Sequence, residues 1–100
     1  MLWAVYCVDK PGTAAARSEH LKEHRAYLDK AETHIFFSGP LQSDDAEAQV
    51  GSLFILNVGS REEAQAFVDN EPFHNVGIFQ QVSIFRMKKM RYNPHLVDVI

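Results

Sequence analysis

The chain has 100 residues, of which 46% are hydrophobic, 11% aromatic and 23% charged. This composition supports one packed core and excludes disordered, fibrous and collagen-like chains, and the length is too short for two domains. Ten Lys and Arg residues against 13 Asp and Glu residues give a formal net charge of -3, which disfavours binding to a phosphate backbone. We expect one soluble domain that binds no nucleic acid, with a core of about residues 1–88 and a tail at 89–100.

The single cysteine, Cys7, excludes an internal disulfide and fits a reducing compartment. The longest apolar run covers residues 1–8, far short of the ~20 residues that span a bilayer. No Lys or Arg precedes this run, as one would in a signal peptide. We therefore expect a cytoplasmic protein without a membrane segment.

Taken in chain order, residues 2–8 are apolar on both alternations, which predicts a central strand. Turn-forming residues follow at 9–12, and Thr13 is placed to cap a helix that runs to about residue 31. Residues 33–39 predict a second strand that ends where glycine and proline follow. The polar, acidic residues 42–50 predict a mobile connection of the kind that covers sites.

Residues 51–58 predict a third strand, and Ser60 with Glu63 forms a capping box that starts a second helix. Asn70 and the proline at 72 end this helix, and residues 71–77 predict a loop. A fourth strand is predicted at about residues 78–87. The basic residues at 86–91 favour a solvated strand end or a dimer contact. At the end of the tail, residues 93–100 predict a short strand or a docking arm.

The predicted order βαββαβ indicates an α+β fold, a ferredoxin-like sandwich with an antiparallel sheet and two helices on one face. Two helices cover only that face, yet the strands carry large apolar residues on both alternations. A second copy is the simplest cover for the other face, because two-fold association buries the same patch on both subunits. We therefore expect a homodimer packed through its sheet faces.

The most informative candidate residue is His24, which lies between Leu21 and Leu28 on the apolar side of the first predicted helix. An imidazole with a carboxylate neighbour is oriented by it and is suited to acid/base work near neutral pH. The alternative is a core histidine that is hydrogen-bonded to the backbone. His20 and His24 are four residues apart, but no third ligand is evident, so we expect no metal and no cofactor.

Four further polar residues are candidates for the same site. Glu71 precedes a proline, which fixes the local backbone and can aim the carboxylate inward. Ser52 shares its strand face with large apolar residues, and Arg17 lies on the stripe of His24, where a guanidinium can bind a carboxylate or phenolate. These three residues also have structural interpretations. Glu71 can be a solvated loop acid, Ser52 a serine at a strand edge, and Arg17 a side chain whose guanidinium extends to water. His74, close to Glu71, is a further candidate for substrate contact.

Several short motifs follow one another with a characteristic spacing: Arg17, His24-Arg25-Ala26-Tyr27-Leu28, Ser38-Gly39-Pro40-Leu41, Gly51-Ser52, Glu71-Pro72-Phe73 and Gly77. Over roughly residues 1–87 this order resembles the YCII-related proteins. The resemblance implies a dimeric α/β-barrel of ferredoxin-like subunits. It also implies an active-site pair of a helix-one histidine and the acid of an Asp-Pro-aromatic motif, here His24 and Glu71. The glutamate departs from that motif and moves the carboxylate by about one methylene.

Members of that family that resemble dehydrochlorinases of chlorinated hydroxyquinols use a serine with the histidine, which implies Ser52 here. We therefore expect a cofactor-free enzyme in which His24, oriented by Glu71, moves a proton on a small organic substrate, with aromatic compounds among the candidates. Arg17 would hold an anionic group of this substrate. Elimination, dechlorination and isomerisation all fit such a site. The alternatives are a non-catalytic ligand-binding or stress-associated dimer, and a purely structural dimer. The pair requires His24 and Glu71 to lie within hydrogen-bond or one-water reach beside a cleft.

Overall fold

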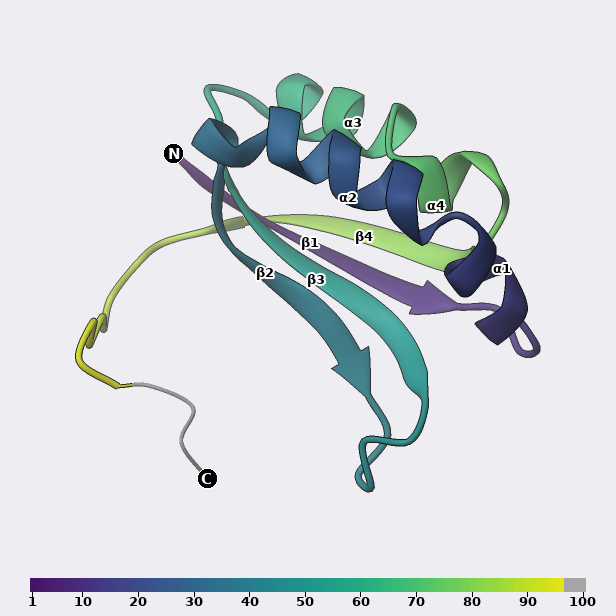
Figure 1. The fold of residues 1–100 in the computed structure, drawn as a ribbon. Coiled ribbons are helices and arrows are strands. Elements are labelled where there is room, and N and C mark those ends of the chain that lie inside the picture. The colour runs from purple at the N-terminus through teal and green to yellow at the C-terminus, as the bar shows by residue number, and fades with distance from the viewer. Residues whose placement is uncertain (97–100) are drawn as a thin grey trace.

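The computed structural model describes residues 1–96, which form a four-stranded antiparallel sheet with its helices on one face (Figure 1). The sheet has the order β2-β3-β1-β4, and its strands are β1 (Leu2–Asp9), β2 (Ile35–Gln42), β3 (Gln49–Asn57) and β4 (Phe79–Met87). The helices are α1 (Ala14–Glu19), α2 (Leu21–Lys30), α3 (Arg61–Asp69) and α4 (Pro72–Asn75), with a 3-10 turn η1 (Glu32–His34). The predicted α+β, ferredoxin-like arrangement is confirmed.

The strand register decides which side chains face the helices. In β1, Val5 and Cys7 are each 1% exposed and point toward the helices. Their partners on β3 are Phe54 and Ser52, respectively. Because side chains alternate along a strand, a slip by one residue would turn all of these positions to the opposite face. The register thus places Ser52 beside the core, on the helix-covered face.

The opposite face of the sheet carries no helix within residues 1–96 (Figure 1). It exposes large apolar side chains. Tyr6 is 45% exposed, and Phe37 and Phe85 are each 64% exposed. These three residues share the face because the register pairs them with Leu53, Ile55 and Ala4, which all lie on the same alternation. An apolar face of this extent is typical of a surface that another layer covers.

The first predicted helix is wrong in one respect, because His20 divides it into α1 and α2. His20 has φ -103° and ψ 10°, outside the helical range, while its N–H still donates to Ala16 O at 3.0 Å. Its own carbonyl accepts from His24 N at 3.0 Å, so a new helix axis begins there. Thr13 does not cap α1 through its side chain, since its hydroxyl donates to Lys10 O at 2.9 Å instead.

The second strand also extends further than the sequence predicts. β2 runs to Gln42, through Gly39 and Pro40, and Pro40 pairs with Ser52 of β3. β2 is an edge strand, so the missing N–H of proline costs no ladder hydrogen bond there. The mobile connection predicted for residues 42–50 is correspondingly shortened to residues 43–48.

The segment after α3 is helical where a loop is predicted. Pro72 begins α4, and the side chain of Glu71 caps it by accepting a hydrogen bond from His74 N at 3.2 Å. A proline in the first turn suits a helix start, because its missing N–H would have no partner inside the helix. The capping box of α3 is confirmed: Ser60 Oγ accepts from Glu63 N at 3.1 Å, and the Glu63 carboxylate accepts from Gly59 N.

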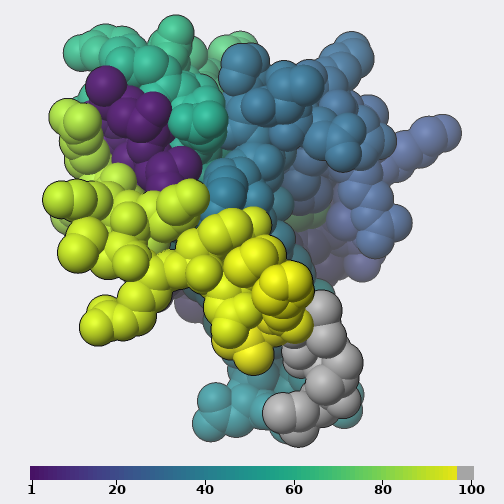
Figure 2. Space-filling model, turned by 90° about the vertical axis from the view of Figure 1, so that its left-hand side faces the viewer, coloured from purple at the N-terminus to yellow at the C-terminus, as the bar shows by residue number. Residues whose placement is uncertain are grey.

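Two side chains of the tail, which is yellow in Figure 2, lie close to Phe36 at the start of β2. The centroids of the Tyr92 and Phe36 rings are 5.7 Å apart. Lys89 Nζ lies 4.8 Å from the Tyr92 centroid and 5.9 Å from the Phe36 centroid. Residues 93–96 form no strand, and the rest of the predicted strand or arm, residues 97–100, lies outside the described residues. No helix within residues 1–96 is long and apolar enough to cross a bilayer.

Candidate active site

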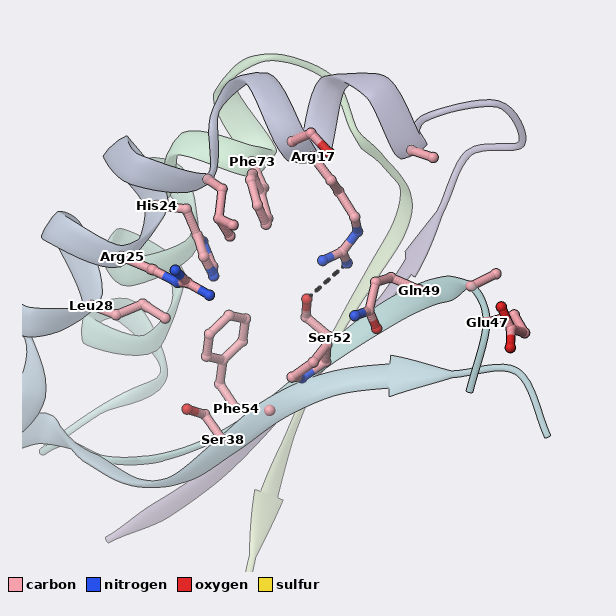
Figure 3. Close-up of a pocket in the computed structure, with 16 residues that line it drawn as sticks. Arg17, His24, Arg25, Leu28, Ser38, Glu47, Gln49, Ser52, Phe54 and Phe73 are labelled. Atoms are coloured by element: carbon pink, nitrogen blue, oxygen red, sulfur yellow. Dashed lines mark hydrogen bonds between the residues drawn. The ribbon is translucent and has the colours of Figure 1, made fainter. Parts of the chain in front are cut away.

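A pocket of about 580 Å³ lies between the helix layer and the sheet, bordered by α1, α2, β2 and β3 (Figure 3). Its lining includes Arg17, His24 and Ser52, three residues that the sequence analysis selects. They come from α1, α2 and β3, so the break at His20 brings two helices to one pocket.

His24 lines the pocket and forms a hydrogen-bonded pair with Glu71, which lies behind it and does not line the pocket. His24 Nδ1 contacts Glu71 Oε1, although the two residues are 47 positions apart. Glu71 is 1% exposed and the His24 side chain 11%, so neither is a solvated surface group. The carboxylate holds Nδ1 as the donor, which leaves Nε2 as the nitrogen that can accept or release a proton. Within residues 1–96 no protein group bonds to Nε2.

Aromatic rings fix the orientation of this imidazole. The ring of Phe73 stacks on His24 with centroids 3.9 Å apart and planes at 4°, and Phe54 meets it edge-on at 6.5 Å. Phe73 is fully buried, and its ring centroid also lies 5.0 Å from Arg17 Cζ. The carboxylate therefore directs one nitrogen, while the stacked ring sets the plane of the imidazole.

Arg17 is held rigidly beside the same pocket by four hydrogen bonds. Its Nε donates to Asp9 Oδ2 at 2.6 Å, and its Nη2 donates to Asp9 Oδ1 at 3.0 Å, Gly51 O at 2.8 Å and Ser52 Oγ at 3.1 Å. The side chains of Arg17 and Asp9 are 10% and 5% exposed, so this guanidinium does not extend to water. A side chain at Gly51 would meet Cys7 O at 2.2 Å, which explains the glycine there.

Ser52 has the hydrogen-bond pattern of a donor toward the pocket. It is 3% exposed, and its oxygen already accepts from the cationic Arg17, which leaves its own O–H free to donate. Figure 3 shows this contact as a dashed line, at the side of the pocket opposite the α2 residues. The arrangement can therefore place a hydroxyl donor near a ligand oxygen.

The structure does not bring His74 to the pocket. Its ring lies 6.4 Å from that of Phe79, and its contact with the pair is through the backbone, where His74 N donates to Glu71. Sequence reasoning missed Asp9, Phe73 and Arg25, of which the last two line the pocket. The sequence did contain a signal for Asp9: it is an acidic residue at the end of the first predicted strand, and only a short connection separates it from the helix that carries Arg17.

Burial raises the pKa of the Cys7 thiol to about 12, and the nearby Glu71 and Asp9 charges act in the same direction. Cys7 therefore stays a neutral thiol near pH 7 and has no nucleophilic character there. Burial and Glu71 likewise raise the pKa of Tyr27, whose hydroxyl donates to Phe67 O at 2.8 Å. Within residues 1–96, no group of three His, Cys, Asp or Glu side chains is placed to hold a metal ion.

The fold and the pocket define the class: a ferredoxin-like α+β protein with a histidine–carboxylate pair between its helices and its sheet. The YCII-related domain matches residues 1–88, and the chain belongs to this family. Two relatives named Protein YciI, from Escherichia coli O6:H1 and Shigella flexneri, are each 30% identical to it over 97 residues. In both comparisons the matched part is 90% of this chain and 99% of the relative.

The solved structures that are similar to this chain include the following two. The first is 5-chloro-2-hydroxyhydroquinone dehydrochlorinase (TftG) from Burkholderia phenoliruptrix, in complex with 2,5-dihydroxybenzoquinone. It is 32% identical, with a TM-score of 0.81 over 88% of this chain and 94% of that one. The second, a protein from Pseudomonas aeruginosa, is 18% identical with a TM-score of 0.52 over 90% and 93% of the two chains. At that identity the second likeness concerns the fold alone.

Proposed function

We propose that this protein is a cofactor-free enzyme in which His24 moves a proton on a small organic substrate with an oxygenated ring. The observation that carries the proposal is the contact between Nδ1 of His24, which lines the pocket, and the buried carboxylate of Glu71 behind it. A carboxylate in this position stabilises the imidazolium that forms when Nε2 accepts a proton. The dehydrochlorinase that this chain resembles gives further support, because it acts on an oxygenated ring.

The reaction class is an elimination or an isomerisation. His24 Nε2 takes a proton from a C–H or O–H group of the substrate, and the electron pair left behind forms a new π bond. In an elimination, a leaving group such as chloride departs with its own bonding pair. In an isomerisation, the imidazolium returns the proton to another atom, so that no group is lost.

Ser52 and Arg17 would stabilise negative charge on a substrate oxygen during this step. Arg17 Nη1 has no protein partner within residues 1–96, and the Ser52 hydroxyl is free to donate. Preformed donors of this kind stabilise charge that develops in a transition state. We assign Ser52 the role of a donor and not of a nucleophile, because within residues 1–96 its hydroxyl contacts a cation and no general base.

We propose in addition that a second copy covers the open face of the sheet. Tyr6, Phe37 and Phe85 expose a continuous apolar surface there, on the face opposite the pocket. Two-fold association would bury the same side chains on both subunits. The proposed dimer would cover the side of the sheet that the helices leave open, while the pocket lies on the helix side.

The test is a turnover screen of small oxygenated and chlorinated ring compounds with the wild type and His24→Gln. We expect the variant to lose at least about 100-fold in kcat, as for removal of a general acid or base, while its circular dichroism is unchanged. His20→Gln is the matched control, because it makes the same substitution four residues away, outside the pocket. Equal turnover by His24→Gln and the wild type contradicts the proposal. Binding without turnover supports the ligand-binding alternative.

A further inference from the structure

A second arginine faces the pocket without a counter-charge. Arg25 follows His24 on α2 and lines the pocket, and Figure 3 shows its guanidinium directed into the pocket near His24 and Phe54. Within residues 1–96, Arg25 has no side-chain hydrogen bond and no ion pair. A guanidinium carries five N–H donors and is always charged, so these donors are free for a ligand.

The other charges of the pocket are already compensated or lie elsewhere. Arg17 has its bidentate partner in Asp9, and Glu71 is paired with His24 behind the pocket wall. Glu47 is the acid among the lining residues, and it belongs to the β2–β3 connection, at the far end of the pocket from Arg25 in Figure 3. The end of the pocket next to His24 therefore presents one uncompensated positive charge.

The walls around this charge are apolar and aromatic. Leu21 and Leu28 line the pocket from α2, and Phe54 and Phe73 line it from the sheet and from α4. Such walls favour a ligand with a flat ring, because a planar ring can stack on the aromatic side chains of the pocket. A ring with one ionised oxygen would match both the walls and the free guanidinium.

We propose that Arg25 is the anion-binding residue of this pocket and that the ligand is a planar ring bearing a carboxylate, phenolate or enolate oxygen. The ligand oxygen accepts hydrogen bonds from Arg25, and the ring lies against the aromatic wall, within reach of His24. This assignment rests on the proposed function, since it names the substrate class of the same pocket. The two arginines then have different roles. Arg25 binds the oxygen that is already ionised in the free ligand, while Arg17 stabilises the negative charge that develops on a substrate oxygen during the reaction.

The test compares two probes with the same ring and different charge, 2,5-dihydroxybenzoate and 2,5-dihydroxybenzamide. Their affinities are measured by NMR titration for the wild type, Arg25→Gln, Arg25→Lys and Lys22→Gln. Lys22→Gln is the matched control, because it removes one positive charge from the same helix at a residue that does not line the pocket.

We expect the wild type to bind the carboxylate about 10-fold more tightly than the amide, as a charge-assisted hydrogen bond allows. Arg25→Gln should abolish this preference, Arg25→Lys should keep part of it, and Lys22→Gln should keep it within about twofold, because water and salt screen a distant charge. The inference is wrong if the wild type has no preference, if Arg25→Gln weakens both probes equally, or if Lys22→Gln has the same effect.

The two proposals fail in different ways. Charge preference is read from binding alone, so it does not depend on turnover. A preference that depends on Arg25, in a protein without turnover of any ring compound, overturns the proposed function and supports the anion site. Turnover that depends on His24, with equal affinity for both probes, overturns the anion site and supports the proposed function.

Discussion

The imidazole of His24 lies flat on the ring of Phe73, with centroids 3.9 Å apart and planes at 4°. Glu71, two residues before Phe73, accepts the hydrogen bond of His24 Nδ1 and also caps α4. One short helix and its cap therefore set both the plane of the imidazole and the direction of one ring nitrogen. This relationship explains why a helix of four residues matters to a site that lies mainly on α1, α2 and the sheet.

Phe73→Leu should disturb His24 more than an equal loss of volume elsewhere in the core. Phe67→Leu is the matched control, because Phe67 packs on Phe54 and Tyr27 without stacking on His24. Each variant should lose about 1–2 kcal/mol of unfolding free energy. The His24 ring signals in NMR spectra should shift and broaden in Phe73→Leu alone. Equal shifts in both variants would mean that Phe73 contributes only to packing.

Glu71→Asp should keep the cap of α4 but lose the contact with His24. Aspartate is a good capping residue, yet its side chain is about one methylene shorter and leaves a buried imidazole N–H unpaired. We expect a loss of about 1–3 kcal/mol in urea unfolding. A double-mutant cycle with His24→Gln should give a coupling of at least about 0.5 kcal/mol. A coupling of zero would show that the two side chains do not depend on each other.

Asp9→Asn should be strongly destabilising, because it leaves the buried Arg17 guanidinium without its counter-charge. Removal of one partner of a buried ion pair costs about 3–5 kcal/mol, and the free energy of unfolding in urea measures this loss. Asp29→Asn is the control, since Asp29 is exposed on α2 and should change stability by no more than about 0.5 kcal/mol. Similar stabilities of the two variants would contradict the assigned role of Asp9.

Cys7→Ala should remove a loss of unfolding free energy that the wild type undergoes as the pH rises above about 9. The pKa of the thiol rises from 9.0 to about 12 on folding, chiefly through burial. Between these values the unfolded chain has lost the thiol proton and the folded chain has kept it, so unfolding becomes easier as the pH rises. The contribution reaches about 1.4 kcal/mol per pH unit at most.

The measurement is the difference in unfolding free energy between the wild type and Cys7→Ala, from pH 8 to pH 11. The difference should be constant up to about pH 9 and then fall as the wild type loses stability. Tyr27, whose pKa is also raised, is present in both chains and cancels from the difference. Parallel curves over the whole range would show that the thiol ionises equally in both states.

Phe85→Glu should convert the proposed dimer into a folded monomer. Phe85 is 64% exposed at the open sheet face, where a second copy would bury the new charge without a partner. Val76→Glu is the control, because Val76 is an exposed apolar residue at the end of α4, away from that face. Light scattering at micromolar concentration should give half the wild-type mass for Phe85→Glu alone. A monomeric wild type would contradict the dimer.

The sequence by itself determined the order of the four strands and of the two main helical segments, because each depends on periodicity within a few consecutive residues. The break at His20 and the short helix α4 were not predicted. The apolar pattern on both sides of residues 2–8 predicts the central strand, and Ser60 with Glu63 predicts the start of α3. Local patterns were less reliable where position in the sheet matters. Pro40 continues β2 only because that strand lies at the edge, which no neighbouring residue encodes.

Only the tertiary structure decided the contacts of the site. His24 was identifiable from its place in an apolar stripe, and the family resemblance implied Glu71 as its partner. Local sequence alone left Glu71 open to interpretation as a solvated loop acid, because the two residues are 47 positions apart. Arg17 meets Asp9 through the turn that joins β1 to α1, and both charges are buried only once β3 supplies Gly51 O and Ser52. Such pairs depend on how helices pack on the sheet, so their burial and partners follow from the folded chain and not from local sequence.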